Sequence, residues 1–258
     1  MTVKITNFQK VQEFTTGFDV ARTSTPSDKQ FKLRWDLILE ESDELFDALI
    51  DENCVEILDA VSDILYVVLG AADTFNQDFD AILSDSIGKD EFNISKLKYL
   101  LKDEILLMPF NEDRMKIIFQ EETEKLNLLQ NEYSTAMRNL KEAFVTKNID
   151  NITNKLVHVY NYLYQWAYLF GFDLDLTFCL VHDSNMSKLA ESEKVAQETV
   201  EWYLKNETRY DSPAYRLSPV KVNGEERWII YNSSTGKVLK SINYHPVDLG
   251  KYLHLSSQ

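Results

Sequence analysis

Three glutamates in one segment, Glu40, Glu41 and Glu44, form a group whose type and spacing could do chemistry. In a helix, residues three and four apart share a face, so these carboxylates occupy one neighbourhood of the surface. Like charges placed in this way repel one another. They are stabilised either by facing solvent or by binding a hard, oxygen-seeking cation such as Mg²⁺. Taken alone, the spacing favours a solvated acidic face.

Two aspartates in the next segment, Asp59 and Asp63, change the balance between these interpretations. They stand four residues apart on one stripe of a segment that is otherwise apolar nearly all round, with Glu56 one turn earlier. An ionised carboxylate that is buried without a partner is strongly destabilising, and residues 54–75 contain no lysine or arginine. We therefore expect Asp63 to face a metal ion.

The two acidic segments are separated only by residues 51–53, so they must pair as antiparallel helices. In that arrangement Glu41, Glu44 and Asp63 can converge on one ion. Their donor atoms are all oxygens, which suits Mg²⁺, with Mn²⁺ as a candidate substitute.

Apolar spacing and turn signals predict the elements that position these residues. Helices are expected at about Phe8 to Phe18, Lys29 to Ile50, Cys54 to Phe75, Arg114 to Phe144, Ile152 to Phe170, Leu174 to His182 and Glu191 to Leu204. Residues 85–111 are expected to be irregular, apart from a short helix at 94–107. A hairpin is expected from Tyr215 to Tyr231 around the Asn-Gly turn, followed by a further β-segment from Val238 to Ile242.

Composition limits the fold and the partners. The 258 residues are 44% hydrophobic and contain only 7 glycines and 5 prolines, which favours a folded, mainly helical protein. The net charge of −15 opposes binding to nucleic acid or to an anionic membrane. No signal peptide or membrane span is evident, so a cytoplasmic protein is expected. The two cysteines, Cys54 and Cys179, have no metal-ligand spacing and are expected to be core thiols.

An internal repeat is the main organisational feature. A shift of 95 positions, without a gap, superimposes 54–83 on 149–178. Identical pairs include Asn53 and Asn148, Ala72 and Ala167, Phe75 and Phe170, Asp78 and Asp173, and Asp80 and Asp175. We interpret this as two copies of one helical hairpin. The expected division is a catalytic half at 1–84, a degenerate second half at 85–190, and a C-terminal helix with a β-hairpin at 191–258.

The acids occur in one copy only. In the repeat register, Thr135, Ala136 and Asn139 stand opposite Glu40, Glu41 and Glu44, whereas Asn154 and His158 stand opposite Asp59 and Asp63. Generic surface charge should be scattered over both copies. A site that is used once predicts acids in one copy and a purely structural role for the other.

These residues resemble the all-α nucleoside triphosphate pyrophosphohydrolases, the superfamily of MazG-like proteins, dimeric dUTPases and phosphoribosyl-ATP pyrophosphohydrolase. The superfamily pattern of EExxE followed by an acid-rich helix is matched by Glu40 to Glu44 and by Asp59 to Asp63. Phage-type MazG-like members add an arginine before the glutamates, an HxxNMSKL motif and a GKVLKxxNY tail. Here these are Arg34, His182 to Leu189, and Gly236 to Tyr244.

The resemblance implies Mg²⁺-dependent cleavage of a nucleoside triphosphate between its α and β phosphates, in a nucleotide-pool housekeeping role. It implies a general base, Glu40. The implied metal ligands are Glu41, Glu44, Asp59 and Asp63, and the implied substrate-binding residues are Arg34, Asn185, Lys188, Lys240 and Tyr244. The chain resembles a fused pseudo-dimer, and a homodimer of such chains stays open. His182 is equally consistent with a packing residue and with a ligand.

Some alternatives also stay open. Ala60 stands where much of the superfamily has a glutamate, so Asp59 or Glu56 is expected to substitute, or one metal position is lost. A non-catalytic nucleotide-binding or interaction protein with this fold is the alternative function. A di-iron bundle is disfavoured, because no histidine has a glutamate three residues before it. The base and sugar of the substrate are not specified by the sequence.

Overall fold

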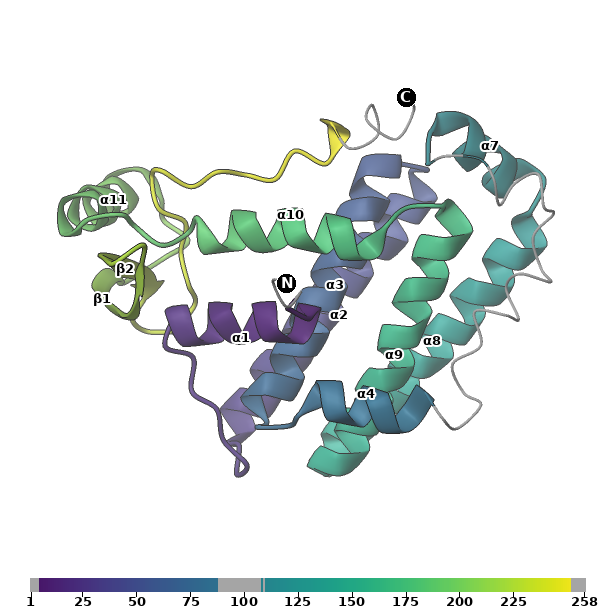
Figure 1. The fold of residues 1–258 in the computed structure, drawn as a ribbon, viewed down its shortest axis with the longest axis horizontal. Coiled ribbons are helices and arrows are strands. Elements are labelled where there is room, and N and C mark those ends of the chain that lie inside the picture. Colours follow the sequence, from purple (N-terminus) through teal and green to yellow (C-terminus); the bar gives the residue numbers. More distant parts are fainter. Residues whose placement is uncertain (1–4, 88–107, 109, 252–258) are drawn as a thin grey trace. The chain divides into compact units, whose positions relative to one another are not determined.

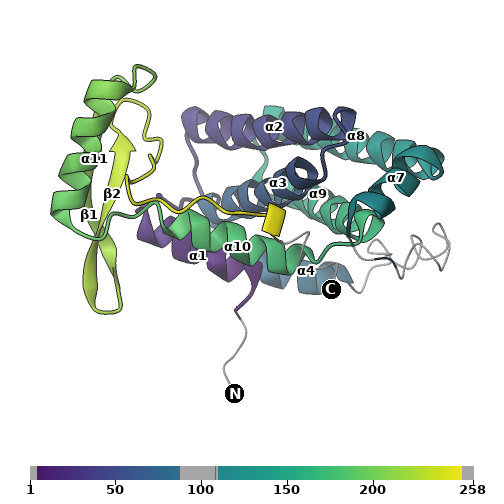
Figure 2. The ribbon, with the colours of Figure 1, turned by 90° about the horizontal axis from the view of Figure 1, so that it is seen from above.

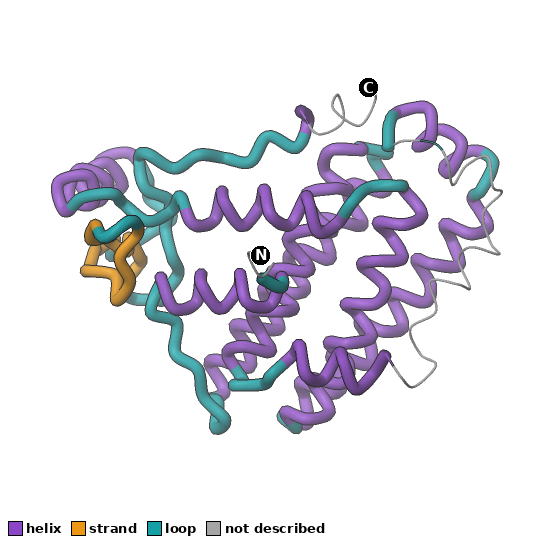
Figure 3. The backbone as a smooth tube through the Cα atoms, in the orientation of Figure 1, coloured by secondary structure: helices purple, strands orange, loops and turns teal. Residues whose placement is uncertain are grey.

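The computed structural model describes residues 5–87, 108 and 110–251. Most of this chain is helical, and its two strands form a small antiparallel sheet (Figures 1 and 3). The predicted all-α class with a small C-terminal β-rich extension is therefore confirmed. The elements are α1 (Asn7–Gly17), α2 (Asp28–Ile50), α3 (Cys54–Thr74), α4 (Phe79–Ile87), α7 (Glu112–Gln120), α8 (Thr123–Thr146), α9 (Ile149–Phe170), α10 (Leu174–Met186), α11 (Glu193–Asn206), β1 (Pro213–Val222) and β2 (Glu225–Asn232).

The chain divides into two compact units. Unit 1 contains residues 1–8, 22–179 and 248–258, and unit 2 contains 9–21 and 180–247. Both copies of the repeat therefore belong to unit 1.

The two repeated hairpins have matching helix starts. Helices α2 and α8, α3 and α9, and α4 and α10 each begin 95 residues apart, as the repeat register predicts. The identical residues explain this agreement. Asn53 and Asn148 are the N-caps of α3 and α9. Asp78 and Asp173 accept hydrogen bonds, both at 3.1 Å, from the third backbone N–H beyond them, at the starts of α4 and α10.

Helix α4 corrects the expectation that the chain is irregular from residue 85, because it continues to Ile87. Its first residue, Phe79, is fully buried and packs edge-on against Tyr160. The Asp78 cap and the buried Phe79 side chain therefore fix the start of α4. The short helix expected at 94–107 lies outside the described residues.

The long helix expected from Arg114 to Phe144 is two helices, α7 and α8. The break falls at Glu122, whose buried carboxylate pairs with Lys125 at 2.5 Å. Arg114, also buried, donates hydrogen bonds to the carbonyls of Tyr168 and Leu169 at the end of α9. Gly171 follows with φ 84°, and a Cβ there would collide with the Arg114 guanidinium. Tertiary burial of two charged side chains therefore overrides the continuous helical pattern.

The core of unit 1 lies between the hairpins. Helix α3 packs against both α2 and α9, and α8 packs against α9. Figure 2 shows α2 and α8 in one layer and α3 and α9 in the next. Apolar side chains fill the interior, and buried hydroxyls pair across it, as between Ser42 and Tyr133 at 2.8 Å and between Ser62 and Thr177 at 2.9 Å.

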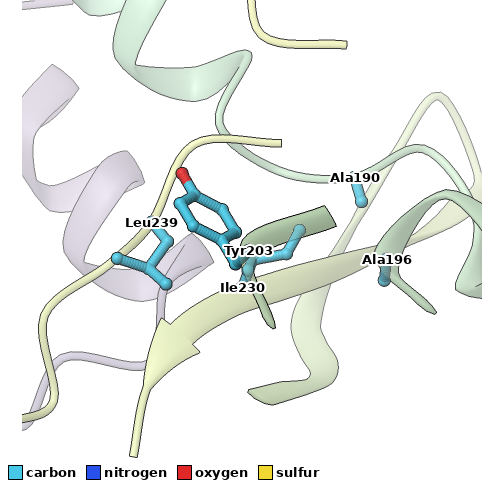
Figure 4. Packing of buried hydrophobic residues seen from close by; sticks show 5 residues of the cluster. All are labelled: Ala190, Ala196, Tyr203, Ile230 and Leu239. Atoms are coloured by element: carbon cyan, nitrogen blue, oxygen red, sulfur yellow. The ribbon is translucent and has the colours of Figure 1, made fainter. Parts of the chain in front are cut away.

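Unit 2 is built on α11 and the β-hairpin. The predicted hairpin is confirmed, with Asn223 and Gly224 both at positive φ in its turn. Its small core, shown in Figure 4, comprises Ala190, Ala196, Tyr203, Ile230 and Leu239. The segment expected as a further strand at 238–242 forms only an isolated bridge between Val238 and Tyr231. The Lys240 carbonyl accepts a hydrogen bond from the Tyr203 hydroxyl, and this side-chain contact takes the place of a hydrogen bond from a neighbouring strand.

Candidate functional site

The five acids of the first copy lie on two helices that pack together. Glu40, Glu41 and Glu44 come from α2, and Asp59 and Asp63 come from α3. Three of the side chains, Glu41, Asp59 and Asp63, are partly buried, whereas Glu40 and Glu44 are exposed. The cluster therefore has an inner part against the apolar interior and an outer part toward solvent.

The charges of this cluster act on one another. Burial raises the pKa of the Glu41 carboxyl to about 8, and nearby negative charges add to the effect. These charges belong, in order of their effect, to Asp63, Glu44, Glu40 and Asp59. The five predicted residues are thus close enough to be coupled electrostatically, across both helices. Without a counter-ion, the cluster holds a proton near neutral pH.

Glu44 shows the same effect more weakly. Burial raises its pKa, followed by the charges of Glu40, Glu56 and Asp47, while a hydrogen bond with Glu41 lowers it. Burial is thus the largest cause of the raised pKa in both glutamates. Glu56 and Asp59 therefore both border the cluster. Ala60 is 3% exposed and belongs to the core.

The donor set of the cluster suits a divalent cation. Carboxylate oxygens are the ligands that Mg²⁺ prefers, and the pKa of Glu41 is raised by burial and by the negative charges around it. In the described part of the chain, no group of three or more His, Cys, Asp or Glu side chains is close enough to hold a metal ion. The chemistry of the residues fits Mg²⁺, whereas their present rotamers do not form a closed ligand shell.

A second charged group contains the predicted Arg34 of α2 together with Asp73 of α3, which sequence reasoning missed. Asp73 is 1% exposed and accepts a hydrogen bond from the Arg22 Nε at 2.8 Å. Its charge also acts on Arg34, although burial dominates and lowers the pKa of that guanidinium to about 10. The Arg34 Nε is buried and has no hydrogen-bond partner among the residues that the structure describes. In the sequence, Asp73 is a single acidic residue near the end of an otherwise apolar helix, and this pattern could have identified it.

The remaining predicted residues belong to unit 2, where they form two pairs. The Lys188 Nζ donates to the Asn185 side-chain oxygen at 2.5 Å, as their spacing predicts. The Lys240 Nζ lies 4.7 Å from the centre of the Tyr244 ring. Ser184 donates at 3.0 Å to the Tyr244 hydroxyl, which fixes the tail against the end of α10.

His182 lies beside an acidic side chain, and neither cysteine forms a disulfide. The buried His182 ring lies 3.3 Å from the Glu13 carboxylate, and burial lowers the pKa of the imidazole. The sequence left two roles open for His182, packing residue and ligand, and these buried surroundings favour packing. Cys54 and Cys179 are free and partly buried. In the described residues, no helix combines the length and the apolar character needed to cross a bilayer.

Comparison with known proteins identifies the class. Residues 11–86 match the phosphoribosyl-ATP pyrophosphohydrolase family, and this segment contains all five acids. The chain belongs to the all-α nucleoside triphosphate pyrophosphohydrolase superfamily, which includes the MazG-like proteins, so the resemblance seen in the motifs is confirmed. The family is one of nucleotide pyrophosphohydrolases.

The relationship to one particular protein extends much further along the chain. The sequence is 36% identical over 249 residues to "Uncharacterized protein L479" of Acanthamoeba polyphaga mimivirus, covering 92% of each chain. This likeness therefore includes the second copy and most of the C-terminal region. No solved structure matches the chain.

Proposed function

We propose that the protein is a Mg²⁺-dependent nucleoside triphosphate pyrophosphohydrolase, which converts a nucleoside triphosphate and water into a nucleoside monophosphate and pyrophosphate. The observation that carries the proposal is the cluster around Glu41, whose pKa is raised by burial and then by four further carboxylates in its surroundings. A folded protein keeps such a destabilising arrangement where a bound cation compensates for it. The membership of the superfamily supports the same reaction class.

In this proposal the inner carboxylates hold the cation. Glu41, Glu44, Asp59 and Asp63 supply oxygen ligands, and metal uptake displaces the proton from Glu41. Bound Mg²⁺ supplies positive charge for the phosphate oxygens. The acidic surroundings would otherwise repel a triphosphate, because like charges at this distance oppose one another.

Glu40 is the proposed general base. It is exposed at the solvent side of the cluster, where a water molecule can reach it. The Glu40 carboxylate takes a proton from the water molecule while the oxygen of that water bonds to the α phosphorus. The bond from that phosphorus to the bridging oxygen breaks, and pyrophosphate leaves with the electron pair. The proton on Glu40 then returns to solvent.

Substrate binding is assigned to cations and to an amide. Lys188, Lys240 and Arg34 are proposed to contact phosphate oxygens, with Asn185 on the base or sugar and the Tyr244 ring beside it. Their pairing within unit 2 supports a shared role, because Asn185 touches Lys188 and Tyr244 lies against Lys240. A dUTPase-like role in nucleotide-pool housekeeping is the proposed setting.

A non-catalytic nucleotide-binding protein is the second candidate. The buried Ala60 at a superfamily acid position and the open ligand arrangement both favour it. It predicts nucleotide binding without product formation. A single assay therefore separates it from the enzyme.

The test is a panel of deoxynucleoside and ribonucleoside triphosphates incubated with Mg²⁺, with products identified by ³¹P NMR. The proposal predicts monophosphate and pyrophosphate in equal amounts from at least one nucleotide, and no product in EDTA. Diphosphate and free phosphate as products would refute the bond assignment. Binding without turnover across the panel would establish the second candidate.

A further inference from the structure

The second copy contains an open cavity of about 310 Å³ between α8 and α9. Its volume is near the lower end of the range of small-molecule sites, roughly 300–1,000 Å³. Apolar atoms form the larger part of its surface, but seven of its eight lining residues carry a charged or hydrogen-bonding group. Among them are Glu132, Thr135, Asn139, Lys155, His158 and Tyr162.

The position of this cavity within the fold is informative. The repeat register places Thr135 and Asn139 at the positions of Glu40 and Glu44, and His158 at the position of Asp63. The cavity is therefore the second copy's counterpart of the carboxylate cluster. The second copy has no acids at these positions and has an open space there between its two helices.

The charge at this place differs between the copies, because a lysine and a glutamate in the cavity offset one another. The first copy gathers five acids there, whereas the cavity has one acid, Glu132, together with Lys155 and a histidine. Lys155 occupies the position of Ala60. In a chain of net charge −15, a cavity with a lysine, a histidine and amide donors is a local site for an anion. Lys155 and His158 thus occupy the positions of Ala60 and Asp63 of the first copy.

Tyr162 on α9 and Glu132 on α8 also line the cavity. Burial raises the pKa of the Tyr162 hydroxyl, and the charge of Glu132 adds to this effect. The tyrosine is thus neutral, and offers a ring face and a hydroxyl donor. An aromatic face beside a lysine suits a ligand with both a planar ring and an anionic group.

We infer that this cavity binds a nucleoside monophosphate without a metal ion, with Lys155 and His158 contacting the phosphate and Tyr162 contacting the base. The site is separate from the proposed active site and requires neither Mg²⁺ nor turnover. Asn139 supplies an amide for the same phosphate. A nucleoside monophosphate and inorganic phosphate both carry a phosphate dianion, whereas only the monophosphate carries a base.

Isothermal titration of the full-length protein in EDTA at low salt tests this inference. The probes are nucleoside monophosphates, inorganic phosphate and the parent nucleosides. We expect monophosphates to bind more tightly than phosphate or nucleoside, and Lys155→Met to weaken that binding about tenfold or more. Lys141→Met, which removes an exposed lysine of α8 outside the cavity, is the matched control and should bind like the wild type.

Two further variants keep the result decisive. Asn139→Asp, at an exposed position, adds a repelling charge and should also weaken binding, even where Lys155→Met fails to fold. Asp63→Asn should keep the wild-type affinity in EDTA, because it alters only the first copy. No binding of any monophosphate, equal affinity for the nucleoside, or unchanged binding in both cavity variants would overturn the inference. Since no turnover is measured, these outcomes are independent of the proposed enzymatic activity.

Discussion

The two copies of the helical hairpin share a frame but differ in chemistry. Their helices begin at equivalent residues, and Asn53 and Asn148 cap corresponding starts. At the place where α2 and α3 gather five acids, α8 and α9 line an open cavity with a lysine, a histidine and one glutamate. The frame thus depends on caps and apolar positions, whereas a handful of polar positions decides what each copy can bind.

The comparison also separates stability from function. In the first copy, the burial of Glu41 among other acids is unfavourable for the metal-free fold. The second copy has Ala136 at the equivalent position and carries no such penalty. The predictions below test this contrast.

Neutralising Asp63 should have the largest effect. Asp63→Asn keeps the shape and removes one ligand charge, so turnover should fall about a hundredfold or more, equivalent to about 2.7 kcal/mol. The matched control is Asn154→Ala, at the exposed second-copy counterpart of Asp59, which should keep the rate within about threefold. Steady-state kinetics and circular dichroism check both variants. Near-normal turnover by Asp63→Asn would remove the first copy from the active site.

A change in unit 2 should act on substrate affinity and leave the metal site intact. Lys188→Met removes one proposed phosphate contact, so KM should rise about tenfold, near 1.4 kcal/mol, with unchanged Mg²⁺ affinity. Lys194→Met, on the exposed face of α11, is the control. Deleting the tail instead would also remove Leu239 from the core of unit 2. An unchanged KM for Lys188→Met would strike this lysine from the site.

The Glu41 carboxyl should give the metal-free protein a distinctive pH dependence. Its folded pKa of about 8 lies above the ordinary value of 4.5, so the folded state keeps a proton that the unfolded state releases. Stability should therefore fall as pH rises from about 4.5 to 8. Glu41→Gln cannot ionise, so its Tm in EDTA should exceed the wild-type value at pH 8 by about 2–4 °C per kcal/mol recovered.

The comparison of Glu41→Gln with the wild type has two built-in checks. The Tm difference should vanish near pH 4.5, and Mg²⁺ should raise the Tm of the wild type more than that of the variant. Parallel pH profiles for the two proteins would contradict the coupling of Glu41 to the cluster.

The caps should give the smallest and most equal effects. Asn53→Ala and Asn148→Ala each remove the side-chain acceptor at a helix start, and each should cost about 1 kcal/mol of unfolding free energy. Urea denaturation measures both. A cost confined to one of the two variants would show that the copies do not depend on the same frame.

Much of the fold could be predicted from the sequence, because long apolar periodicities and cap residues act locally. The repeat was visible for the same reason, since Asp78 and Asp173 perform the same capping role. The break between α7 and α8 could not be predicted, because it depends on the burial of Glu122 and on Arg114 reaching the end of α9. Those contacts join distant parts of the chain.

The candidate site was predictable in part. The five acids have the spacing of one cluster, and the two helices bring them together as expected. Asp73 was missed, because its partner Arg22 is 51 residues away. The second-copy cavity was also missed, because a cavity arises from how side chains fill the space between helices, which no motif records.

The most direct test of the central claim is an anomalous difference map from a crystal soaked in Mn²⁺. The account predicts a peak beside Glu41, Glu44 and Asp63 in the first copy, and none in the second-copy cavity beside Asn139 and His158. A peak in that cavity, or an empty first copy under saturating Mn²⁺, would contradict the assignment of metal chemistry to the first copy alone.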